Sequence, residues 1–241
     1  MLRGLWKLTW VELKIFLREP MGAFFTLGFP VVLFLIFGRV YGNETGIMTR
    51  SIPIFAVIGI ATSGILSLVI IISIYREGGI LKRLKTTPLS PITILTAHFL
   101  VKFILIATGM TAIFLLGGAM YNIPFTDNLF SFVLAFILCT VSLVSLGYVI
   151  ASIVPTARFA QPIASAVVYT MIFYSGIFFD VGKISSSLTY VAQVMPLTHA
   201  ANLLSGVWEG DNWSNYTMET IFLLLTTVVC LAVSSKIFRW E

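Results

Sequence analysis

Residues 52–75 read IPIFAVIGIATSGILSLVIIISIY, an apolar run that contains no Asp, Glu, Lys or Arg. An α-helix rises 1.5 Å per residue, so about 20 mostly apolar residues cross the ~30 Å hydrocarbon core of a bilayer. The run lacks the alternating polar pattern of a strand in a membrane barrel. It therefore predicts a membrane-spanning helix.

Similar apolar runs occur along the rest of the chain. They cover residues 21–40, 93–119, 129–153, 160–179 and 217–235. Within these runs, Lys102 is expected to snorkel to the nearer interface. The predicted fold class is an all-α integral membrane protein with six transmembrane helices, in a single domain over residues 1–241.

The composition excludes an ordinary soluble domain. The chain is 58% hydrophobic and 10% charged, whereas soluble domains are about 25% charged. A soluble fold of this size could not hide so much apolar surface, because its own surface must stay largely polar.

The charge distribution predicts the orientation. If the N-terminus is inside, Arg39, Arg50 and Lys183 fall outside and the other 12 of the 15 Lys and Arg fall inside. This asymmetry follows the positive-inside rule and predicts that both termini are cytoplasmic. The net charge of +5 is then a consequence of topology, and no nucleic acid partner is expected.

Residues 1–19 separate apolar from basic side chains on a predicted helix. The apolar face carries Leu2, Leu5, Trp6, Trp10, Leu13, Phe16 and Leu17, and the basic face carries Arg3, Lys7, Lys14 and Arg18. Such a helix is suited to lie in the cytoplasmic membrane interface, and Pro20 ends it. Alternatively, this segment only extends the first span.

The segment after the second span, 76–91, reads REGGILKRLKTTPLSP and is the most basic inner loop. On a short helix, Ile80, Leu81 and Leu84 would form an apolar strip beside three basic residues. The basic residues are Lys82, Arg83 and Lys85. Such a helix could insert into a groove of a cytosolic partner. The residues alone leave an ordinary positive-inside loop equally open.

Segment 180–213 is neither a span nor a polar loop. Its apolar residues recur near helical spacing, with interruptions at 185–187 and at Pro196. Amphipathic helices that re-enter the outer leaflet would fit this pattern, and a surface cap is the alternative. The candidate outer-gate residues are Tyr174, Phe178, Phe179, Pro196 and His199.

Four motifs carry a resemblance to a known family. They are the Arg-Glu-Pro that ends the N-terminal helix, REGGILKRLKTTPLSP at 76–91, YSGIFF at 174–179 and MPLTHAANLLSG at 195–206. Together they resemble the permease subunits of type-two ABC exporters, a group that includes small drug-export permeases of the bacterial plasma membrane. The resemblance covers essentially the whole chain.

The resemblance implies that 76–91 is the coupling helix, which seats in a cytosolic ABC ATPase subunit. The residues that match it are Arg76, Glu77, Ile80, Leu81, Lys82, Arg83, Leu84 and Lys85. It also implies re-entrant helices between spans five and six, a pair of permeases and two ATPase subunits. Gly147 and Ala151, four residues apart, would permit close helix approach without identifying the permease interface.

No phosphate-binding G-x-x-x-x-G-K-[ST] loop occurs in the chain. No catalytic, cofactor-binding or metal-binding residue is assigned, so ATP and Mg²⁺ are expected on the partner ATPase. The Phe-rich spans suit an amphipathic or hydrophobic substrate, first a drug or peptide antibiotic, then a lipid-linked glycan or sodium.

Three other functions compete with export: a secondary transporter, an intramembrane protease and a purely structural membrane scaffold. A secondary transporter usually places ionisable groups at mid-membrane, and the spans hold almost none at that depth. An intramembrane protease could combine Ser63 or Ser175 with His199. However, lone serines in membrane helices usually pack or hydrogen-bond.

Overall fold

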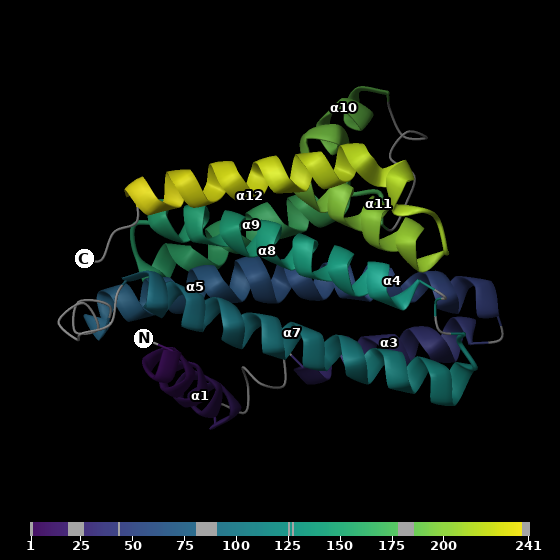
Figure 1. The fold of residues 1–241 in the computed structure, drawn as a ribbon, viewed down its shortest axis with the longest axis horizontal. Coiled ribbons are helices and arrows are strands. Elements are labelled where there is room, and N and C mark those ends of the chain that lie inside the picture. The colour runs from purple at the N-terminus through teal and green to yellow at the C-terminus, as the bar shows by residue number, and fades with distance from the viewer. Residues whose placement is uncertain are drawn as a thin grey trace.

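The computed structural model describes residues 2–18, 27–42, 44–80, 91–124, 126, 128–177 and 186–237. Every regular element within these ranges is a helix. Figure 1 shows long helices that run side by side, with α1 lying obliquely near one end and with the N and C labels at that same end.

The helices follow one another without an intervening strand in the described ranges. They are α1 (Leu2–Arg18), α3 (Phe29–Tyr41), α4 (Thr45–Ala61), the π-helix η2 (Thr62–Ser67), α5 (Leu68–Glu77), α7 (Pro91–Tyr121), α8 (Leu129–Ile153), α9 (Ala157–Tyr174), α10 (Ser186–Val194), α11 (Pro196–Trp208), the 3₁₀ turn η4 (Trp213–Tyr216) and α12 (Thr217–Ile237).

Four described helices are long and apolar enough to cross a membrane. They cover Gly46–Glu77, Thr96–Tyr121, Leu129–Ile153 and Trp213–Ile237. They correspond to the second, third, fourth and sixth predicted runs, so the chain is an all-α, multi-pass membrane protein.

The first and fifth predicted spans are represented by shorter helices. The first contains the apolar helix Pro30–Tyr41, and residues 19–26 lie outside the described ranges. The fifth is α9, whose first turns contain Arg158, Gln161 and Pro162. That these two helices also cross the bilayer stays a prediction.

The second span is one continuous helical rod of α4, η2 and α5. It begins at Thr45, earlier than the predicted start at residue 52, and it includes Pro53. The π-helix lies in its middle, at Thr62–Ser67. Such π segments distort the regular helical ladder and are frequent at functional sites.

Helix α8 lies at the centre of the molecule and packs against α12, α11, α5 and η2. It comes close to the second span at Gly147, where a Cβ atom would lie 2.6 Å from the carbonyl oxygen of Gly64. Ala151 is fully buried one turn later. The two small residues therefore permit close approach inside this chain and are not available to a second permease.

We expect the G147A variant to lower the free energy of unfolding by about 1–3 kcal/mol, the usual cost of overpacking. Its new methyl group would lie nearest to the backbone carbonyl oxygen of Gly64, which cannot move aside as a flexible side chain can, and next to Cδ2 of Leu68. Thermal unfolding of the detergent-purified protein measures this loss.

The matched control is G59A, because a Cβ atom at Gly59 meets nothing within 4 Å. Alanine also favours a helix more than glycine does, so G59A should be neutral or slightly stabilising. Equal melting temperatures for the two variants would contradict the proposed close packing at Gly147.

Candidate functional site

The predicted coupling segment begins where α5 ends. Gly79 adopts a φ of +66° in the turn after α5, a conformation that glycine adopts readily. Of the predicted coupling residues, Arg76, Glu77 and Ile80 are described, and Ile80 is exposed. The remaining five lie outside the described residues: Leu81, Lys82, Arg83, Leu84 and Lys85.

Arg76 attaches the end of α5 to the end of α8. Its buried guanidinium donates hydrogen bonds to the carbonyl oxygens of Ala151 at 3.2 Å and Val154 at 2.5 Å. The last carbonyls of a helix lack partners within the helix and carry partial negative charge, so a cation there is favourable.

Glu77 attaches the same end of α5 to the start of α9. Its Oε1 accepts a hydrogen bond from the backbone N–H of Ala157 at 2.7 Å, and Thr156 makes no side-chain cap. A carboxylate suits the positive end of a helix. Adjacent residues of α5 therefore hold both sides of the α8–α9 turn.

A third attachment, absent from the sequence prediction, joins the N-terminal helix α1 to this region. The hydroxyl of Tyr75 donates to Oε2 of Glu12 at 3.0 Å. The same oxygen lies 3.8 Å from Nδ1 of His98 on α7. The sequence contains one indication of this attachment, because Glu12 is the only acidic residue in the otherwise basic helix α1.

The prediction that Lys102 snorkels to the interface is wrong. Lys102 is 3% exposed, and its Nζ donates to Oγ of Ser67, the last residue of the π-helix, at 2.6 Å. The ammonium also lies 5.7 Å from the centre of the Phe16 ring. A buried ammonium needs such partners because its desolvation is costly.

A cavity of about 30 Å³ lies among these groups, lined by Glu12, Phe16, Tyr75, His98 and Lys102 with three aliphatic side chains. A cavity of this size is large enough to hold a water molecule. Burial raises the pKa of the Glu12 carboxyl above its usual range, and the Tyr75 hydrogen bond and the Lys102 charge oppose that shift.

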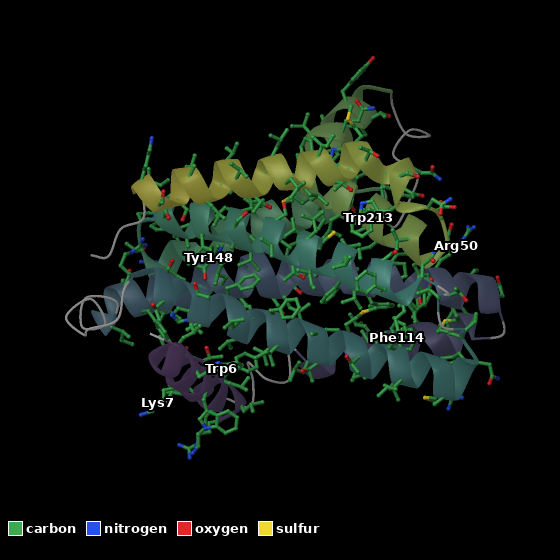
Figure 2. The ribbon with its side chains drawn as sticks, in the orientation of Figure 1. Trp6, Lys7, Arg50, Phe114, Tyr148 and Trp213 are labelled. Atoms are coloured by element: carbon green, nitrogen blue, oxygen red, sulfur yellow. The ribbon has the colours of Figure 1, made fainter. Side chains whose placement is uncertain are left out.

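The other end of the bundle contains α10 and α11. Arg50 and Trp213 lie at this end, opposite Lys7 (Figure 2). Arg50 forms an ion pair with Glu209 at 2.9 Å, but both side chains are largely exposed, so the pair contributes about 0–1 kcal/mol. Helix α11 is mostly buried and packs against α4, α8, α9 and α12.

The predicted outer-gate residues are only partly described. Phe178 and Phe179 lie outside the described residues, and Pro196 starts α11. Nε2 of His199 lies 2.8 Å from the carbonyl oxygen of Gln193, and its ring stacks on Phe222. His199 thus connects α10 to α12. Tyr174 makes an edge contact with Phe173.

The serines considered for a protease show no nucleophile–base pair with His199. The hydroxyl of Ser175 donates to the carbonyl oxygen of Ile172 at 2.7 Å. Ser63 lies within the π-helix and lines a cavity between the second and third spans. Within the described residues, no group of three His, Cys, Asp or Glu could hold a metal ion.

We expect R76M to lower the free energy of unfolding by about 2 kcal/mol, since hydrogen bonds to charged groups contribute ~1.5–3 kcal/mol. The methionine keeps the apolar stem but leaves the carbonyls of Ala151 and Val154 without the guanidinium. Thermal unfolding measures this effect, with R39M on an exposed arginine as the control. Identical losses in both variants would exclude a specific role for Arg76.

Comparison with known proteins identifies the family. Residues 3–207 match the family model of the ABC-2 type transporter, which covers both flanks of the segment 81–90. No curated protein is significantly similar to the chain. Because the family match spans most of its length, the chain belongs to the ABC-2 type transporter family and is the membrane permease component of an ABC transporter.

Proposed function

We propose that this permease forms the translocation pathway of an ATP-driven exporter for an amphipathic or hydrophobic substrate. A drug or peptide antibiotic is the first choice, and a lipid-linked glycan or sodium comes next. The observation that carries the proposal is the attachment of Arg76 and Glu77 to the α8–α9 turn. It ties the start of the segment 76–91 to two further helices.

The proposed role of 76–91 is to bind the ATPase and to transmit its movement. Ile80, Leu81 and Leu84 would supply the apolar contact, and Lys82, Arg83 and Lys85 would pair with acidic groups. Because Arg76 and Glu77 contact α8 and α9 directly, displacement of this segment would move three helices together. ATP and Mg²⁺ would bind to the ATPase.

The proposed assembly contains two permeases and two ATPase subunits in a bacterial plasma membrane, with both termini cytoplasmic. The N and C labels lie at the end of the bundle where α5 ends and α7 begins (Figure 1). This supports placing both termini and the connection between α5 and α7 on the same side of the membrane. The opposite end, with α10 and α11, would face outward, where Tyr174, Phe178, Phe179, Pro196 and His199 would gate the exit.

One observation favours the alternative of a secondary transporter. The buried groups Glu12, His98 and Lys102 lie close together, and ionisable groups within a membrane often serve ion or proton coupling. A secondary transporter would act without an ATPase, so dependence on ATP separates the two functions.

We expect the double variant R83E/L84D to insert in the membrane but to lose the ATPase. The change reverses one charge and places a carboxylate in an apolar contact, which costs several kcal/mol if it stays unpaired. Co-purification of the ATPase and its turnover in liposomes are the measurements.

The matched control is R50E, which reverses a charge at the opposite end of the bundle (Figure 2) and should leave ATPase binding unchanged. Full retention and normal turnover of the ATPase with R83E/L84D would show that this loop is only a topology signal.

The proposed orientation predicts distinct labelling from the two sides of the membrane. A cysteine at position 186, the first residue of α10, should react with an impermeant maleimide added outside. A cysteine at position 7, on α1, should react only in inverted vesicles. Labelling of position 186 solely from the cytosolic side would contradict the proposed orientation.

A further inference from the structure

Glu12 joins helix α1 to both flanks of the segment 81–90. On one flank, Tyr75 lies two residues before the end of α5 and donates its hydroxyl to the Glu12 carboxylate. On the other flank, His98 lies in the first turns of α7 and approaches the same oxygen. One carboxylate oxygen therefore contacts the helix that enters this segment and the helix that leaves it.

Apart from the buried Thr9, the rest of the α1 contact surface is apolar. Phe16 is buried against Val101 and Leu105 of α7. Trp6 and Trp10 are about two-thirds exposed, and Lys7 lies on the outer side of α1 (Figure 2). Helix α1 thus rests on α7 through an apolar patch, and Glu12 is the point at which it also reaches α5.

The carboxylate does not maximise the stability of this contact. Within the described residues, the titratable groups that face the Glu12 carboxylate are Tyr75 from α5 and His98 and Lys102 from α7. Burial raises its pKa, and Tyr75 and Lys102 offset only part of that effect. A raised pKa means that docking of α1 is favoured below that pKa and weakened above it, where the carboxylate is ionised. A neutral amide should therefore hold α1 at least as firmly.

We propose that Glu12 is a positioning residue that transmits movement of the segment 81–90 to helix α1, through Tyr75 on one flank and His98 on the other. This inference rests on the proposed function, in which an ATPase moves that segment. Because one carboxylate oxygen lies 3.0 Å from the Tyr75 hydroxyl and 3.8 Å from the His98 ring, α1 would follow α5 and α7 as their ends separate or approach.

Lys102 extends the same connection toward the middle of the membrane. Its ammonium binds Ser67 at the end of the π-helix and acts electrostatically on Glu12. A change in the charge or position of Glu12 would therefore act through Lys102 on Ser67, at the end of the π-helix. Buried ionic contacts of this kind suit a switch better than a stabilising bond.

The test compares E12Q with the control E44Q, which neutralises an exposed acid before α4. Spin labels are attached at K7C on α1 and K236C on α12, after Cys139 and Cys230 are replaced by alanine. The full complex of permease and ATPase is reconstituted in nanodiscs. The label separation is measured without nucleotide and with ATP and vanadate, together with thermal unfolding, ATPase co-purification and turnover.

We expect the protein with the native Glu12 to show a nucleotide-dependent change in the distance between the labels at positions 7 and 236. The E12Q variant should unfold at the same or a higher temperature and retain the ATPase. It should nevertheless lose the distance change and lower coupled turnover by about tenfold, within the range of ordinary coupling free energies. Y75F, which removes the hydroxyl donor, should act in the same direction, and E44Q should change nothing.

Three outcomes would overturn the inference. Parallel losses of melting temperature and turnover in E12Q would show that Glu12 is merely structural. An α1–α12 distance unaffected by nucleotide, in a complex that hydrolyses ATP, would exclude transmission to α1 while the proposed function stands. Failure of the ATPase to associate with the unmodified permease would reject the proposed function itself and this inference with it.

Discussion

The absence of water in hydrocarbon is the constraint on which the rest of this structure depends. A backbone N–H or C=O without a partner there costs several kcal/mol, so a spanning segment must satisfy its polar groups internally. The hydroxyls of Thr62, Thr140, Ser152 and Thr226 likewise donate to carbonyl oxygens four residues earlier in their own helices. These four hydroxyls are thus satisfied within their own helices and do not meet lipid as free donors.

Helix ends are under the same constraint, and here charged side chains form hydrogen bonds with their unpaired backbone groups. The last carbonyls of α8 accept from Arg76, and the first N–H of α9 donates to Glu77. The groups that stabilise a helical turn are therefore the groups that connect it to α5. Stability and mechanical connection depend on the same two residues, which begin the segment proposed to bind the ATPase.

Sequence patterns predicted most of the architecture because the spans are local features. The predicted run 129–153 coincides with α8, and the helix predicted over the first 19 residues corresponds to α1, Leu2–Arg18. The family match likewise bears out the resemblance carried by the motifs. These predictions needed only hydrophobicity, charge and short motifs.

The sequence could not show which helix faces meet. Lys102 lies in the first half of α7, and a lysine in a span commonly snorkels to the nearer interface. Here α1 packs near that position, and Ser67 accepts a hydrogen bond from the ammonium. Gly147 could have faced a second permease, and it instead packs on the backbone of Gly64. Glu12 gains its partners from α5 and α7, which lie far along the chain. Each of these depends on tertiary contacts between distant segments.

The π-helix divides the second span into two halves with different angular registers. A regular helix turns 100° per residue, so one additional residue in a turn rotates everything that follows by about that angle. The first half, α4, packs against α3, α7, α8 and α11, whereas the second half, α5, packs against α8 and α9. A single helical wheel drawn through residues 45–77 would therefore assign side chains of one half to the wrong neighbours. The helix faces that meet a pathway, lipid or another helix therefore have to be assigned separately for α4 and for α5.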